Sequence, residues 1–231
     1  MADSLLAAIR RFVPVTLVEA TRPLRLYFHP QRRFDRRWGV ETSTCVNVED
    51  LDTDDATKVH SSGYEPTRRS EFARVMRSLE RPLESYTFVD LGSGKGAALL
   101  YAMEYPFRRI VGVELTANLH RIAQQNIARM GARRPRLDAS RVQNLCMDVA
   151  DFRFPDEPIL CFLYNPFKGR TLDTVVDSLR RSLARTPRDV MVVYLHTLSR
   201  HGAWDRAEFL AMERRERRFT VYRSRSTRPG D

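Results

Sequence analysis

Short apolar segments alternate along the chain with segments in which apolar residues recur every three or four positions. The apolar segments, each of which predicts a buried strand, are residues 87–91, 109–114, 142–147, 158–164 and 190–196. Helical spacing occurs at residues 4–13, 72–79, 97–103, 119–130 and 171–183. This alternation predicts an α/β fold with a mostly parallel sheet and helices on both faces. We expect Thr116 to cap the fourth of these helices and Gly131 to end it.

A glycine-rich turn joins the strand at 87–91 to the helix that follows it. Gly92, Ser93, Gly94 and Gly96 come directly after this strand, and Asp90 lies just inside it. Glycine lets a ligand approach the backbone closely, and amide groups at a helix N-terminus attract anions. The turn is therefore interpreted as a nucleotide-cofactor site, in which Asp90 can bind an ammonium or hydroxyl group. With Ala97 the turn also fits G-x-G-x-x-G/A, so a dinucleotide fold and a turn without ligand both stay open.

Two acidic residues stand at the ends of the next two predicted strands. Glu114 ends the strand at 109–114, and Asp148 follows the strand at 142–147. Ligands of open α/β sheets bind at the carboxyl ends of the strands, where an acidic group can accept hydrogen bonds from ribose hydroxyls. We expect this role for Glu114, and contact with the adenine amino group for Asp148. An exposed loop aspartate is the alternative for Asp148.

The strand at 158–164 ends in a second motif, Tyr164-Asn165-Pro166-Phe167. A side-chain amide and a neighbouring carbonyl, held rigid by proline, can orient the lone pair of an amine toward a methyl donor. Tyr164 and Phe167 can offer their ring faces to the acceptor or to a sulfonium. The alternative is that Asn-Pro only ends a buried strand. His196 could act as a base if the acceptor were a hydroxyl, although a solvated histidine is the simpler interpretation.

Taken together, these strand-end motifs resemble those of the class I S-adenosylmethionine (SAM) methyltransferases over residues 64–225. The resemblance implies a Rossmann-like sheet of seven mostly parallel strands with SAM lying across the strand ends. It places the methionine part of SAM near Asp90 and Gly92, the ribose on Glu114, and the adenine near Asp148. Leu115 and Val149, which adjoin the two acidic residues, are expected at the cofactor as well.

Within this class the segment Gly63-Tyr64-Glu65-Pro66-Thr67 looks most like the non-SET seven-strand lysine methyltransferases. In those enzymes the segment before the glycine turn folds over the methionine, which would put Tyr64, Glu65 and Thr67 at the cofactor. The motif at 164–167 departs from the histone enzymes and is closer to amino-group methyltransferases acting on adenine or glutamine. The C-terminal part is short, so the closing antiparallel hairpin is expected to be truncated.

The segments outside the central pattern are less regular. Basic and aromatic residues interleave over 22–38, which suits either nucleic-acid stacking or an N-terminal cap with solvated arginines. Residues 41–63 are polar and acidic and predict a long loop or lid. Residues 204–225 fit one helix plus one strand or two antiparallel strands. We therefore divide the chain into an N-terminal extension and lid, 1–63, and a methyltransferase domain, 64–231.

The composition narrows the possible partners and location. The formal net charge is +10, but lysine occurs only three times, so the arginine bias of a GC-rich genome could produce this charge without a polyanionic partner. No apolar run is long enough to cross a bilayer, and the first residues have the wrong charge order for a secretory signal. The three cysteines lack metal-ligand spacing, and no metal is expected. These features indicate a cytoplasmic protein with reduced thiols.

The sequence thus predicts a SAM-dependent methyltransferase that transfers a methyl group in line to an amine of a protein side chain or a small molecule. Nucleic acid is a less favoured partner. A non-catalytic SAM- or nucleic-acid-binding module and a small-molecule O-methyltransferase are the alternatives.

Overall fold

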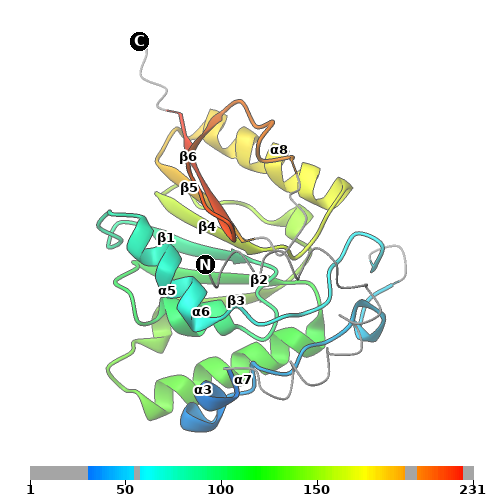
Figure 1. Ribbon diagram of the computed structural model, residues 1–231, viewed down its shortest axis with the longest axis vertical. Helices are drawn as coiled ribbons and strands as arrows, with labels where there is room; N and C mark the ends of the chain where they lie inside the picture. The colour runs from blue at the N-terminus through cyan, green and yellow to red at the C-terminus, as the bar shows by residue number, and fades with distance from the viewer. Residues whose placement is uncertain (1–30, 55–57, 196–201, 226–231) are drawn as a thin grey trace, which may run out of the picture.

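The computed structural model describes residues 31–54, 58–195 and 202–225 (Figure 1). The helix expected at 4–13, most of the basic and aromatic stretch before Gln31, and His196 lie outside the described residues. The part that is described forms a three-layer arrangement of helix, sheet and helix.

The central element is a seven-stranded sheet with the strand order β3-β2-β1-β4-β5-β7-β6. Its strands are β1 Thr87–Leu91, β2 Arg109–Glu114, β3 Val142–Cys146, β4 Ile159–Tyr164, β5 Val190–Leu195, β6 Leu210–Arg215 and β7 Phe219–Ser224. The first five strands pair in parallel, and β7 pairs antiparallel with both β5 and β6. The predicted Rossmann-like α/β class with a mostly parallel sheet is confirmed.

Alternate residues of the strands face opposite layers, as the pleat of a sheet requires. Phe88 belongs to the core cluster that includes residues of α5 Arg69–Ser78, α6 Ala97–Ala102 and α7 Ala117–Arg133, whereas its neighbour Val89 belongs to the cluster with α8 Arg170–Arg185. A further helix, α3 Gln31–Trp38, lies beside α7 on the first of these faces (Figure 1). Short 3₁₀ turns occur at Val48–Asp50, Ala139–Arg141 and Val149–Asp151.

Three details of the prediction are wrong or need revision. The closing hairpin is not truncated, because β6 and β7 are both six residues long and complete the sheet edge. Gly131 does not end α7, which continues to Arg133, because an interior glycine costs only about 1 kcal/mol against alanine, less than packing supplies. Thr116 occupies the N-cap position but its side chain makes no capping hydrogen bond.

Candidate functional site

The glycine turn after β1 adopts a backbone that only glycine takes easily. Gly92, Gly94 and Gly96 have φ angles of 79°, 54° and 81°. Such angles cost other residues about 1–2 kcal/mol each. Gly96 is the N-cap residue of α6, and the amides of Gly92 and Ser93 both donate to the Val113 carbonyl, at 2.9 and 3.0 Å. These bonds hold the turn against the end of β2.

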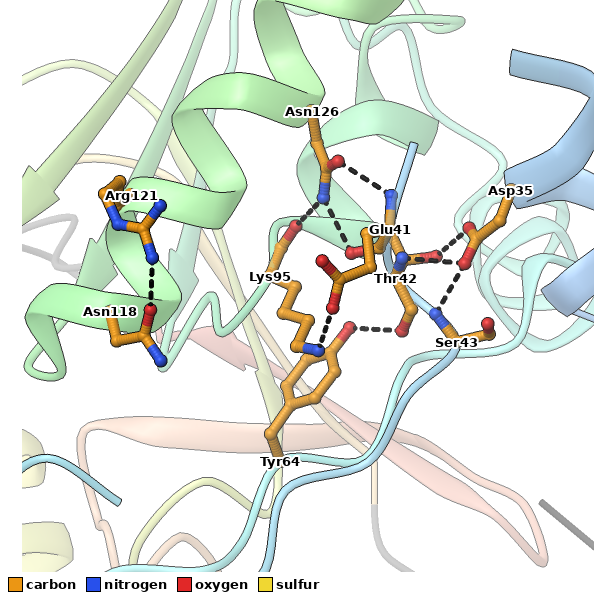
Figure 2. Close-up of polar contacts among 9 residues, drawn as sticks. All are labelled: Asp35, Glu41, Thr42, Ser43, Tyr64, Lys95, Asn118, Arg121 and Asn126. Atoms are coloured by element: carbon orange, nitrogen blue, oxygen red, sulfur yellow. Dashed lines mark hydrogen bonds and ion pairs between the residues drawn. The ribbon is translucent and has the colours of Figure 1, made fainter. Parts of the chain in front are cut away.

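Tyr64 lies directly against this turn. A Cβ built on Gly94 would stand 2.2 Å from the Tyr64 ring, so only a glycine fits beneath it. The Tyr64 hydroxyl donates to the Thr42 carbonyl at 2.8 Å, and burial raises its pKa well above the ordinary value, which keeps it protonated. The residues before β1 are thereby fixed above the glycine turn (Figure 2).

Lys95 ties the turn to the N-terminal segment. Its side chain is only 3% exposed, and its ammonium lies 2.6 Å from the Glu41 carboxylate and 5.7 Å from the centre of the Tyr64 ring. The Asn126 side chain of α7 donates to the carbonyls of both Lys95 and Glu41, each at 2.9 Å (Figure 2). The segment at 41–43 is therefore attached to the glycine turn and to α7 together.

Two buried carboxylates stand beside the turn. Glu114 accepts hydrogen bonds from the Gly94 amide at 2.7 Å and from the Thr116 amide at 2.9 Å. Asp90 is 4% exposed, and its burial, together with the nearby Glu114 charge, raises its pKa to about 8. No described residue donates a hydrogen bond to the Asp90 carboxylate. A buried carboxylate without a partner suits a cationic ligand group, which would restore its ionised form.

The Asn165-Pro166-Phe167 motif contacts the glycine turn from the other side. A Cβ on Gly92 would stand 2.3 Å from the Pro166 Cβ, so the two motifs pack directly together. Asn165 has a φ of 45°, a rare left-handed conformation, and its amide oxygen accepts a hydrogen bond from the Tyr194 hydroxyl at 3.0 Å. Phe167 is buried. Strain of this kind collects at functional sites and persists only where the surroundings impose it.

A strap of residues 60–64 crosses between the two motifs. The Ser62 amide donates to the Pro166 carbonyl at 2.9 Å, and the Lys168 amide donates to the His60 carbonyl at the same distance. Beyond these bonds, Tyr64 packs on Gly94. The Pro166 carbonyl, expected as an acceptor for the substrate amine, thus already has one partner, which leaves it a second lone pair.

A cleft opens between these elements at the carboxyl ends of β1 to β4. Part of this cleft is open to solvent. Fourteen of the residues expected at the site line it: Tyr64, Glu65, Thr67, Asp90, Gly92, Ser93, Gly94, Glu114, Leu115, Asp148, Val149, Tyr164, Pro166 and Phe167. Gly96 and Asn165 are not among the lining residues.

The outer end of the cleft is more exposed. Asp148 accepts a hydrogen bond from the Ala150 amide at 2.8 Å, which makes it the N-cap of the 3₁₀ turn that follows. No described residue donates a hydrogen bond to its other carboxylate oxygen, and Leu115, which also lines the cleft, is 37% exposed. Burial raises the pKa of Tyr164, another lining residue, and the nearby Glu65 charge adds to this shift.

Several lining residues carried no sequence signal of their own. Leu51, Thr53, Ser61 and Ser62 come from the segment expected as a loop or lid, Met147 directly follows β3, and Leu119 lies in α7. Each is an ordinary core or loop residue in sequence, and only its place next to the glycine turn brings it to the cleft. In the described ranges, no three His, Cys, Asp or Glu side chains are grouped so that they could hold a metal ion. None of the described helices has the length and apolar character needed to span a membrane.

The strand order and the mostly parallel pairing define a Rossmann-like fold that solved methyltransferase structures share. A solved structure of a ribosomal protein L11 methylase from Lactobacillus delbrueckii subsp. bulgaricus superposes with a TM-score of 0.50 and 14% identity, over 70% of this chain and 80% of that one. A predicted N6-adenine-specific DNA methylase from Listeria monocytogenes superposes with a TM-score of 0.51 and 17% identity, over 69% of this chain. The chain spans 51% of the Listeria protein. No protein-family model matches the chain, and no curated protein matches its sequence.

Proposed function

We propose that this chain is a SAM-dependent methyltransferase that methylates an amine, on a protein side chain or a small molecule, by direct in-line transfer. The observation that carries the proposal is the contact of Gly92 with Pro166, because it brings the cofactor-type turn next to the Asn-Pro-Phe motif, of which Pro166 and Phe167 line the same cleft. In-line transfer needs donor and acceptor within a few Å of each other, held in one orientation.

The cofactor assignment is supported by the chemistry of the residues at the cleft. The Asp90 carboxylate would pair with the ammonium of the methionine part, and Glu114 would accept hydrogen bonds from the ribose. Asp148 would bind the adenine amino group, with Leu115 and Val149 against the ring. Tyr64, Glu65 and Thr67 would cover the methionine. When bound, SAM supplies a methyl group on a positively charged sulfur.

The acceptor side is built from the end of β4. The Tyr194 hydroxyl fixes the Asn165 amide oxygen at 3.0 Å, and this oxygen keeps a second lone pair for an amine N–H. Pro166 holds the turn rigid, and Tyr164 and Phe167 would enclose the reacting nitrogen. A deprotonated amine is itself the nucleophile, so these residues would align it and exclude water, and no strong base is needed.

Replacement of Asn165 by alanine tests the proposal. We expect turnover to fall by about 100-fold, the effect of a misaligned acceptor, while the SAM dissociation constant stays within about twofold. Asn47→Ala, at an exposed loop position, is the matched control and should change neither value. Glu114→Ala, by contrast, should weaken SAM binding, which titration calorimetry measures.

The activity measurement uses tritiated SAM and cell-extract fractions treated beforehand with protease or nuclease. Label in protease-sensitive or small-molecule fractions supports the proposed acceptor class. Label only in nuclease-sensitive fractions would contradict that class, and tight SAM binding without any transfer would indicate a non-catalytic module.

A further inference from the structure

The outward face of α3 and α7 is strongly basic. The four arginines of α3 are all exposed, and its one acidic residue, Asp35, is turned inward and accepts hydrogen bonds from the Thr42 and Ser43 amides at 2.8 and 2.7 Å. The longer helix α7 contains no acidic residue, and its three arginines are all exposed. The two helices lie side by side (Figure 1), and their exposed arginines are together called here the α3/α7 face.

Ion pairing distinguishes this face from the helix on the other side of the sheet. On α8, Arg180 and Arg181 pair with Asp177 at 2.6 and 3.1 Å, and Arg185 pairs with Asp156 at 3.2 Å. On the α3/α7 face, by contrast, Arg33, Arg36 and Arg129 form no ion pair with any residue that the structure describes. An arginine-rich composition accounts for the number of arginines in the chain, but it does not account for a two-helix surface from which exposed acids are absent.

Arginine side chains of this face also stack on an aromatic ring, which orients them for binding an anion. The guanidinium carbon of Arg37 lies 5.0 Å from the centre of the Trp38 ring; Arg134 stacks on the same ring at 4.9 Å but is paired with the Glu104 carboxylate. A guanidinium held over an aromatic ring keeps its N–H groups at the edge, in the plane where they reach phosphate oxygens two at a time. Fewer side-chain rotamers are then lost when a phosphate binds.

The helix α7 also begins at the cleft. Leu119, near the start of α7, lines the cleft, and the helix rises about 21 Å from there to Arg133 at its far end. The Arg133 guanidinium lies against Gly39, directly after α3, which joins the two helices into one surface. A polymer bound along the α3/α7 face would therefore follow a helix that begins at the candidate site.

We propose that the α3/α7 face binds the phosphate backbone of a nucleic acid, without reading its sequence. Phosphates spaced along a chain match a row of exposed guanidinium groups, and counterion release would drive binding. A membrane surface fits less well, because insertion needs exposed apolar side chains. The large hydrophobic residues exposed in the described ranges are Val59, Leu115 and Met212, none of which lies on α3 or α7. This inference goes beyond the proposed methyl transfer and does not depend on it.

A pair of matched triple variants tests the proposal. Arg33→Gln/Arg36→Gln/Arg129→Gln removes three charges from the α3/α7 face, and Arg180→Gln/Arg181→Gln/Arg185→Gln removes three from α8. Both therefore lower the net charge equally. Binding of fluorescein-labelled 20-nucleotide RNA and DNA is followed by anisotropy between 50 and 200 mM salt, since affinity falls steeply over this range when several phosphates are contacted.

For single-stranded RNA, the slope of log K against log salt should shrink by about 0.7 for each arginine that contacts a phosphate. We therefore expect a smaller slope and a weaker affinity for the α3/α7 variant, and wild-type values for the α8 variant. Equal losses in the two variants would show that only net charge matters and would overturn the proposal. So would an absence of binding by the wild-type protein.

Two further measurements test membrane binding and the integrity of the fold. Vesicles of phosphatidylcholine with 30% phosphatidylglycerol, at lipid concentrations on the order of 1 mM, test the membrane alternative; arginine-dependent binding to these vesicles without RNA or DNA binding would overturn the proposal. Melting temperature and SAM affinity report on folding and on the cleft. Both should match the wild type in both variants, so failure of the methyltransferase proposal remains distinguishable from failure of this one.

Discussion

Gly92→Ala changes a point where the glycine turn and the Asn-Pro-Phe motif pack together. The added Cβ would stand 2.3 Å from the Pro166 Cβ and 3.1 Å from its Cγ. Carbon atoms in favourable contact are about 3.5–4.0 Å apart, so one of the two motifs must move by more than ~1 Å. Neither is a flexible side-chain end, because one is a tight turn and the other a proline ring. The substitution therefore separates the two halves of the proposed site.

The expected loss of stability has two parts. Alanine at a φ of 79° costs about 1–2 kcal/mol. Overpacking against Pro166 adds about 1–3 kcal/mol. For a chain of this size, each kcal/mol lowers the melting temperature by about 2–4 °C. If the turn moves and so relieves the strain, the protein loses SAM affinity instead of stability. A loss of 1.4 kcal/mol in binding free energy corresponds to about a tenfold weaker SAM affinity.

Gly39→Ala is the matched control for this substitution. Gly39 has a similar φ of 65°, but its Cβ would meet the Arg133 guanidinium, a flexible side-chain end away from the cleft. We expect it to lower the melting temperature by about 2–8 °C and to leave SAM affinity and methyl transfer unchanged. Calorimetry with SAM and tritium transfer compare the two variants. If Gly92→Ala kept both values within twofold of Gly39→Ala, the contact with Pro166 would have no functional role and the reasoning would fail.

Two other substitutions test the buried charges. Burial raises the pKa of Asp90 in the folded protein to about 8, against 3.8 ordinarily, so folding favours the protonated form. The free energy of unfolding is therefore highest below pH 3.8, and it falls as the pH rises from 3.8 to 8. Asp90→Asn should make the melting temperature less dependent on pH between 4 and 8; an unchanged slope would contradict the burial of an ionisable Asp90. Glu41→Gln leaves the buried Lys95 ammonium without its carboxylate, and because Glu41 is half exposed we expect a loss of about 1–2 kcal/mol in urea unfolding. Glu213→Gln, which breaks the more exposed pair with Arg81, should cost less than about 0.5 kcal/mol, and equal losses would show that burial of Lys95 is unimportant.

Local patterns were sufficient to predict the α/β class and most element positions. The five parallel strands and the helices between them were found because apolar periodicity and the glycine turn depend on residues close in sequence. The segment at 204–225 allowed two interpretations, since its short apolar groups have neither a clear helical nor a clear strand period. Pairing with β5 decides for two antiparallel strands, and this pairing joins residues far apart in sequence.

The sequence by itself determined the glycine turn, the acidic residues of the first three strand ends and the Asn-Pro-Phe motif, because each is a local arrangement of residue types. Only the tertiary structure decided how these parts meet. Lys95 looked like an ordinary loop residue, yet folding buries its ammonium against Glu41, and Gly92 proved to be a packing contact with Pro166. The exposed arginines of α3 and α7 come from helices that only the fold places side by side. Contacts across the sheet depend on which chain segments become neighbours, and the periodicity of the sequence does not predict these neighbours.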